Sequence, residues 1–135
     1  MTNKADCLFC NVIEDHDMEI SLENETCYFL RKESEQDVLV GSGLIIPKKH
    51  KENVFELSKE EWEDTWNLLQ RARELLDETF SPDGYSIGWN TGKAGGQSVF
   101  HSHLHVIPRF YDEPFAGKGI RHWIKKQENK RDLNT

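Results

Sequence analysis

The stretch Val99-Phe100-His101-Ser102-His103-Leu104-His105-Val106-Ile107 places three histidines at every second position between apolar side chains. In a β-strand, side chains two residues apart project from the same face. The pattern therefore predicts one strand over Ser98–Ile107, with the three imidazoles on one face at intervals of about 6.5 to 7 Å. Such a row of imidazoles indicates a chemical site rather than ordinary packing.

The imidazoles admit two chemical interpretations. Imidazole is a preferred zinc ligand, so the row could hold a catalytic metal, but the nearest carboxylates, Asp112 and Glu113, lie past the predicted end of the strand. Alternatively, a neutral imidazole whose second nitrogen is held by a partner can act as a nucleophile. The glycine-rich segment Thr91–Gln97 favours this interpretation, because the backbone N–H groups of such a loop can approach phosphate oxygens. Ser98 follows the loop and can donate a hydrogen bond to a leaving atom.

The clearest element elsewhere is a helix predicted from about Lys59 to Phe80. Ser58 is a favourable N-cap, and Glu61 follows three residues later, which is the pattern of a capping box. Apolar residues recur at spacings of three and four, which predicts one buried face made of Trp62, Trp66, Leu69, Ala72 and Leu76.

Further strands are predicted from short apolar and β-branched runs at Cys27–Leu30, Leu44–Pro47 and Tyr85–Asn90. Asn11–Asp15 is expected to form a short helix. Several strands around one long helix indicate an α+β fold with an antiparallel sheet. With 135 residues and no internal repeat, the chain has the size of one domain.

Composition excludes some partners. The formal net charge is −7, which disfavours a general nucleic-acid-binding protein, since such proteins neutralise phosphates with basic patches. The only basic cluster, Lys125 to Arg131, is expected to be a solvated helix end. No apolar run approaches the roughly 20 residues that span a bilayer, and the first residues lack an apolar secretion signal, so we expect a cytoplasmic protein without membrane contact.

Three segments together resemble a known family. Gly95–Arg109 closely resembles the signature of the histidine triad superfamily of nucleotide hydrolases and transferases, and Cys7–Cys10 and Leu44–His50 also resemble family segments. The resemblance implies a five-stranded antiparallel sheet with one long helix and shorter helices, in a homodimer. It implies a single domain over 1–135, with a core from about 6 to 110 and a C-terminal extension over 111–135.

The resemblance also implies a role for individual residues. His103 would attack the α-phosphorus of a nucleotide and form a covalent nucleotidyl-histidine, which water then hydrolyses. His105 would contact the phosphate, and His101 would lie at the edge of the site. The other implied roles are assistance to the leaving group by Ser98, binding of the phosphate chain by Gln97, ordering of the site by Asn90, and apolar contact with a purine by Phe9 and Leu30. Where the family commonly has an aspartate for the ribose, this chain has Arg31 and Lys32.

A subset of the family binds structural zinc, and the resemblance assigns the ligands Cys7, Cys10, His50 and His101. Such a Cys₂His₂ site is closed to substrate. A redox pair at Cys7 and Cys10 is the competing interpretation, although the strand-then-helix setting that lowers a thiol pKa is lacking. Cys27 lies in an apolar run and is expected to be buried.

Three functions remain open from the sequence. The first is a nucleotide hydrolase that uses His103, with either phosphoramidates or dinucleoside polyphosphates of adenosine as substrates. The second is a metal-dependent hydrolase with the three histidines as ligands. The third is a zinc-stabilised protein that binds purine nucleotides without significant catalysis.

Overall fold

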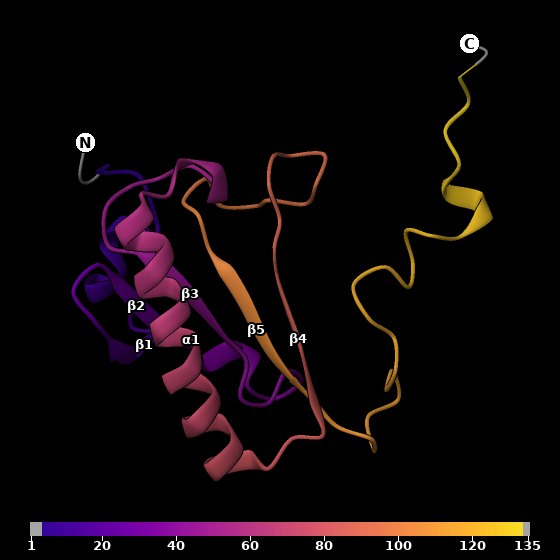
Figure 1. Cartoon of the computed structure of the whole chain (residues 1–135), viewed down its shortest axis with the longest axis horizontal. Helices are drawn as coiled ribbons and strands as arrows, with labels where there is room; N and C mark the ends of the chain where they lie inside the picture. The colour runs from indigo at the N-terminus through magenta and orange to yellow at the C-terminus, as the bar shows by residue number, and fades with distance from the viewer. Residues whose placement is uncertain (1–3, 134–135) are drawn as a thin grey trace.

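The computed structural model describes residues 4–133, which form one antiparallel sheet with a long helix across it (Figure 1). The strands are β1 (Met18–Glu23), β2 (Cys27–Lys32), β3 (Gly43–Pro47), β4 (Gly84–Trp89) and β5 (Leu104–Arg109). They lie in the order β1-β2-β3-β5-β4, and all neighbouring strands are antiparallel. With the helix α1 (Lys59–Phe80), this is the five-stranded α+β fold that the sequence predicted.

The helix begins and ends where its sequence signals predict. Ser58 Oγ accepts a hydrogen bond from the backbone N–H of Glu61 at 3.1 Å, and the Glu61 carboxylate accepts one from the Ser58 N–H at 2.8 Å. These reciprocal bonds complete the predicted capping box and satisfy two amide donors at the helix start. Ser81 follows α1 in the left-handed conformation, with φ of 47°, and stops the helix.

The buried face of α1 differs from the predicted one. Trp62 and Trp66, which were expected in the core, are 52% and 60% exposed. The strip that meets the sheet begins one residue earlier, at Glu61, because the capping bond turns that carboxylate inward. Trp62 instead stacks on Trp89 of β4, with ring centroids 5.4 Å apart. The buried residues of the helix are Glu61, Thr65, Leu68, Ala72 and Leu76.

The strand predicted over Ser98–Ile107 is wrong in its first half, because β5 begins only at Leu104. Leu104 is paired with Ile45 of β3 and with Trp89, the last residue of β4. No ladder pair precedes Leu104, although β3 continues to Pro47, so the chain leaves the sheet at this point. The backbone N–H of Ser102 donates to the carbonyl oxygen of Lys51 instead, at 2.7 Å.

Two elements near the N-terminus also differ from expectation. β1, a short edge strand in which apolar and polar residues alternate, was not predicted from the sequence. The short helix expected over Asn11–Asp15 is a 3₁₀ helix, η1 (Phe9–Glu14), which starts earlier because it includes the apolar Phe9. The other 3₁₀ helices are η2 (Glu33–Glu35), η3 (Val54–Glu56) and η4 (Gln127–Asn129).

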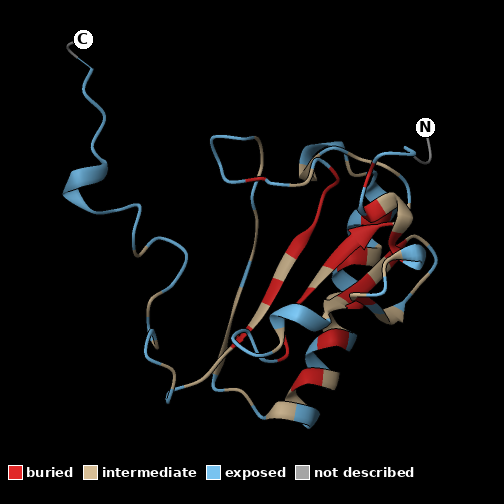
Figure 2. Cartoon of the chain, turned by 180° about the vertical axis from the view of Figure 1, so that it is seen from behind, coloured by how far each residue is buried: buried red, intermediate tan, exposed pale blue. Residues whose placement is uncertain are grey.

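The C-terminal segment stands away from the sheet and is almost wholly exposed (Figure 2). The basic cluster from Lys125 to Arg131 is solvated as expected, but it is not the end of an α-helix, because the described part of this segment contains only the single turn η4.

Apolar side chains pack on both faces of the sheet. On the face toward α1 the buried cluster comprises Cys27, Phe29, Ile45, Leu68, Ala72, Leu76, Leu104 and Val106. On the opposite face it comprises Cys7, Phe9, Val12, Met18, Leu30 and Ile46. The second cluster packs the N-terminal segment, with its paired cysteines, on the face opposite α1. His105 points to this same face, because side chains alternate along a strand and its neighbours Leu104 and Val106 point toward α1. Among residues 4–133, no helix has the length and apolar character to cross a membrane.

We expect Leu68→Ala to lower the free energy of unfolding by about 2–5 kcal/mol, because Leu68 is fully buried between α1 and the sheet. Ile13→Ala, at a site that is 79% exposed, should change it by less than about 0.5 kcal/mol. Urea denaturation of both variants measures the difference, and equal midpoints would contradict the described core.

Candidate functional site

His101 lies fully buried in the loop before β5, and both of its ring nitrogens have defined neighbours. Nε2 lies 2.8 Å from the carbonyl oxygen of Pro47. Because a carbonyl oxygen only accepts, Nε2 carries the proton and Nδ1 presents its lone pair. That nitrogen lies 3.4 Å from Cys7 Sγ and 3.5 Å from Cys10 Sγ. The imidazole is therefore oriented as a ligand toward the two thiols.

His50 completes a four-residue cluster at this point. Its Nδ1 lies 3.3 Å from Cys10 Sγ, and the ligand atoms of Cys7, Cys10, His50 and His101 all lie within 4.8 Å of one another. Around a tetrahedral zinc ion, typical Zn–S and Zn–N bonds place sulfur and nitrogen about 3.6 Å apart. The spacing fits such an ion, and the Pro47 carbonyl holds the outer nitrogen of His101, as a second partner of a metal-binding histidine commonly does. The cluster can hold a metal.

The charge state of the cluster also suits a metal. Burial lowers the pKa of His101 to about 4, which keeps the ring in the neutral form that binds metals. Burial, followed by the effect of the neighbouring Cys7, raises the pKa of Cys10. A bound metal ion would replace the protons of the two neighbouring thiols and stabilise the resulting thiolates.

His103 is oriented by the backbone of His101. Its Nδ1 lies 2.8 Å from the His101 carbonyl oxygen, so Nδ1 donates and the lone pair is on Nε2. Within residues 4–133, this Nε2 has no hydrogen-bond partner. Burial lowers the pKa of His103, so the ring is neutral near pH 7. A neutral imidazole with one fixed, unshared lone pair is the nucleophilic form of histidine.

His105 lies beside His103, with ring centroids 5.0 Å apart. It is the second residue of β5, and burial, followed by repulsion from His103, lowers its pKa. Its Nε2 is buried, and no group of the described residues forms a hydrogen bond with it. A buried polar atom without a partner is uncommon in folded proteins and is typical of a site completed by a ligand.

The loop that precedes the histidines is held by Gln97. The Gln97 Oε1 accepts from the Gly92 N–H at 2.9 Å, and Nε2 donates to the carbonyl oxygens of Glu52 at 2.6 Å and Val99 at 3.0 Å. The carboxamide is thus occupied inside the protein, and its contact with a phosphate chain stays a prediction. Glycine is required within the loop at Gly95, where a Cβ would lie 2.5 Å from the Thr91 carbonyl oxygen.

The remaining predicted site residues lie at different depths. Ser98 is exposed and lines a cavity of about 350 Å³ beside Cys7 and His50. Asn90 is exposed at the start of the glycine-rich loop. The Phe9 ring contacts His103 edge-on at 5.1 Å and His101 at 5.9 Å, while Leu30 is fully buried in the core on the same side. Their contacts with a nucleotide stay predictions.

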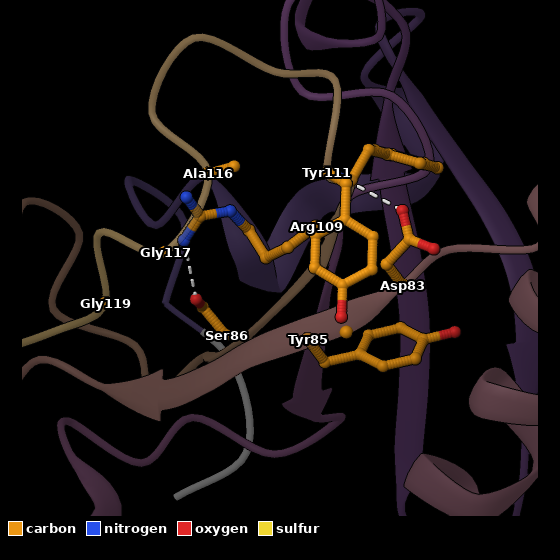
Figure 3. Close-up of a pocket in the computed structure, with 10 residues that line it drawn as sticks. Asp83, Tyr85, Ser86, Arg109, Tyr111, Ala116, Gly117 and Gly119 are labelled. Atoms are coloured by element: carbon orange, nitrogen blue, oxygen red, sulfur yellow. Dashed lines mark hydrogen bonds between the residues drawn. The ribbon is translucent and has the colours of Figure 1, made fainter.

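A separate hollow of about 240 Å³ lies at the far end of β4 and β5, where the C-terminal segment starts (Figure 3). The Arg109 guanidinium there donates to Ser86 Oγ at 2.9 Å and to the carbonyl oxygens of Lys118 and Phe115. The Tyr111 N–H donates to Asp83 at 2.8 Å. These bonds fasten the start of the C-terminal segment, and no histidine or cysteine lines the hollow.

Sequence reasoning missed the backbone acceptors of this site. The Pro47 carbonyl fixes His101, and the carbonyl oxygens of Lys51 and Glu52 hold Ser102 and Gln97. A carbonyl is present in every residue, so no residue type signals its use. The late start of β5 could not be predicted either, because residues 98–103 have the composition of a strand.

Comparison with protein families matches the HIT domain over residues 15–112. "Protein hit" of Bacillus subtilis is 34% identical, covering 77% of this chain and 71% of its own length. A bis(5'-adenosyl)-triphosphatase of Dictyostelium discoideum is 42% identical over 72 residues, which are 53% of this chain and 48% of that protein. An adenosine 5'-monophosphoramidase of Schizosaccharomyces pombe is 29% identical, covering 84% of this chain and 81% of that protein.

Solved structures show the same fold. A HIT family protein from Bacillus anthracis superposes with a TM-score of 0.70 at 30% identity, covering 82% of this chain and 77% of that chain. A zinc-bound histidine triad family protein from Mycobacterium smegmatis superposes with a TM-score of 0.67 at 28% identity, covering 83% of this chain and 81% of that chain.

We expect the purified protein to carry one tightly bound divalent ion, and Cys10→Ser to lower its metal content by at least about tenfold, because one thiolate ligand is lost. Cys27→Ser is the matched control, since Cys27 is buried away from the cluster. Native mass spectrometry with elemental analysis gives the stoichiometry. An equal loss in both variants would contradict the assigned ligand set.

Proposed function

The chain belongs to the HIT domain family, and on that basis we propose that it hydrolyses an adenosine nucleotide at the α-phosphate, with His103 as the nucleophile. Among its relatives are hydrolases of adenosine compounds, one named for a bis(5'-adenosyl)triphosphate and one for an adenosine phosphoramidate. Both chemistries break a bond from the α-phosphorus to oxygen or nitrogen, so the same nucleophile serves either substrate.

In the first proposed step, His103 Nε2 donates its lone pair to the α-phosphorus. A nitrogen–phosphorus bond forms as the bond to the leaving oxygen or nitrogen breaks. Ser98 donates a hydrogen bond to the departing group: a polyphosphate leaves as an anion, whereas an amine takes a proton from solvent as it leaves. His105, whose buried Nε2 has no partner within residues 4–133, binds a phosphate oxygen. The α-phosphoryl group of the nucleotide is then bonded to His103.

In the second step, water attacks the same phosphorus. The phosphorus–nitrogen bond breaks, the pair of electrons returns to His103 Nε2, and the nucleoside monophosphate leaves. The two steps replace one difficult substitution by two easier ones, which is the benefit of covalent catalysis. His103 returns to its starting state.

One observation carries this proposal: the 2.8 Å hydrogen bond from His103 Nδ1 to the His101 carbonyl oxygen. It fixes the tautomer, orients the ring and leaves the lone pair on the nitrogen that has no other partner. The fold and the adjacent His105 support the same assignment. The phosphate chain would lie beside Gln97 and the glycine-rich loop, whose shape is held by internal bonds of the Gly95, Gly96 and Gln97 N–H groups.

For the metal we propose structural zinc, bound by Cys7, Cys10, His50 and His101. The ligand set is two thiolates and two neutral imidazoles, which suits zinc and leaves no open position for substrate. When bound, the ion ties the N-terminal segment to the loop that carries His103, and the chemistry of phosphorus transfer stays with the histidines.

The first test is His103→Asn, which removes the nucleophilic nitrogen. AMP formation from an adenosine phosphoramidate and from a bis(adenosyl) polyphosphate should fall by at least about 10³-fold. Product analysis by chromatography gives the rates, with metal content and circular dichroism as controls for folding.

The alternatives give different outcomes. If the variant retains its activity, His103 is not the nucleophile. If the native protein binds adenosine nucleotides without turnover, the zinc-stabilised binding protein is the better account. Activity that chelation removes, while every substitution of His101, His103 and His105 lowers metal content, would favour a metal-dependent hydrolase.

We also propose that two copies associate through β4 and the exposed face of α1. β4 is an edge strand, and beside it Trp62, Trp66 and Ile87 are exposed around a hollow of about 240 Å³. Exposed apolar surface next to an unpaired strand edge is typical of a protein interface. The other edge strand, β1, carries charged side chains that discourage pairing.

We expect Trp66→Glu to convert the protein from the mass of two chains to that of one, because the introduced carboxylate would be buried without a partner. Phe55→Glu is the control, since Phe55 is also an exposed aromatic residue, 85% exposed, but lies on η3 and outside the proposed interface. Light scattering after size exclusion measures the mass. A monomeric native protein would refute the proposed association.

A further inference from the structure

An ion pair between the partly buried Lys51 and the buried Glu61 joins the loop after β3 to the first turn of α1. Lys51 Nζ lies 3.0 Å from Glu61 Oε1, and the Glu61 side chain is only 4% exposed. A buried carboxylate is costly unless it is paired and hydrogen-bonded. Burial would raise the pKa of Glu61, but the Ser58 N–H and the Lys51 ammonium more than offset this and lower it. The Glu61 carboxylate is thus held ionised beside the Lys51 side chain.

The backbone of the same loop holds the segment that carries the histidines. The Lys51 carbonyl oxygen accepts from the N–H of Ser102 at 2.7 Å, and the Glu52 carbonyl oxygen accepts from Gln97 Nε2 at 2.6 Å. Ser102 lies between His101 and His103. Because this segment has left the sheet, these bonds take the place of the strand ladder that the chain lacks there.

The loop itself needs an anchor, and Lys51 provides it. Its ammonium also donates to the Glu56 carbonyl oxygen at 3.3 Å, and the Glu52 N–H donates to Glu56 Oε1 at 2.9 Å. The Lys51 side chain therefore reaches the helix and η3, while its carbonyl reaches Ser102. Lys51 thus connects the N-terminus of α1 to the backbone next to His103.

We propose that Lys51 and Glu61 are positioning residues that set the place of His103 through Ser102. A displacement of Ser102 moves the adjacent His101 carbonyl oxygen, which is the group that orients the His103 ring. Nucleophilic attack is sensitive to such movement, since a misplacement of about 1 Å can reduce a rate about 10²-fold. The inference rests on the proposed function of His103. It assigns to this ion pair a role that neither residue type nor spacing reveals.

The experiment compares formation of the nucleotidyl-histidine in the native protein and four variants. Lys51→Met removes the ammonium and retains the apolar stem. The double variant Lys51→Met, Glu61→Gln also removes the buried charge, and its Gln retains an acceptor for the Ser58 N–H. Lys51→Arg retains the ion pair. Lys48→Met is the matched control, since it breaks an exposed pair with Glu23 at 2.8 Å in the same loop.

Rapid-quench measurement with a labelled adenosine substrate should show adduct formation slowed about 10- to 100-fold in Lys51→Met and in the double variant. KM should change by less than about threefold, because the pair does not touch the nucleotide. Lys51→Arg should restore most of the rate, and Lys48→Met should equal the native protein. Metal content and melting temperature, measured in parallel, identify a variant that fails to fold.

Two outcomes overturn the inference in different ways. If the double variant folds, retains its metal and forms the adduct at the native rate, the pair is only structural and the positioning role is refuted. If the native protein forms no adduct at all, the proposed function fails, and the positioning role fails with it.

Discussion

The hydrogen bond from His101 Nε2 to the Pro47 carbonyl oxygen, at 2.8 Å, links the sheet to the chemistry of the site. It fixes the buried ring so that Nδ1 faces Cys7 and Cys10. The carbonyl oxygen of His101 accepts a hydrogen bond from His103 Nδ1. One histidine thus faces the cysteine cluster with its side chain and orients the neighbouring histidine with its backbone. Both functions need a fixed tautomer, which a buried carbonyl imposes.

That arrangement requires the chain to leave the sheet before Leu104. In a regular strand the His101 carbonyl oxygen would be directed to a neighbouring strand and could not accept from a side chain two residues later. Leaving the ladder frees this carbonyl, but it also leaves backbone donors without strand partners inside the protein, which is unfavourable unless they find others. The Lys51 carbonyl oxygen satisfies the Ser102 N–H. The loop after β3 is therefore part of the site, because it holds the backbone between His101 and His103.

Local signals predicted the helix well because they are contained in a few residues: the cap of α1 needs only Ser58 and Glu61. The predicted buried face began at Trp62 rather than at Glu61. Apolar periodicity alone does not distinguish the helix face that packs on the sheet from an apolar face that stays exposed. The same limit applies to the histidines. Their alternation predicts a strand, but the first ladder pairs of β5 form only at Leu104. The family resemblance, by contrast, named the four residues that the structure brings together around one point.

The site has neutral histidine rings although its proposed substrate is an anion. Burial lowers the pKa of both His103 and His105, so the site near neutral pH presents neutral rings rather than cations. A cationic His103 would attract phosphate but would have no lone pair with which to attack it. An arriving phosphate favours the charged form of a nearby imidazole and so raises its pKa. In His105 this strengthens the hydrogen bond to a phosphate oxygen. In His103 protonation of Nε2 would remove the lone pair that attacks, so the attacking ring has to be neutral, with its one proton held on Nδ1 by the His101 carbonyl oxygen.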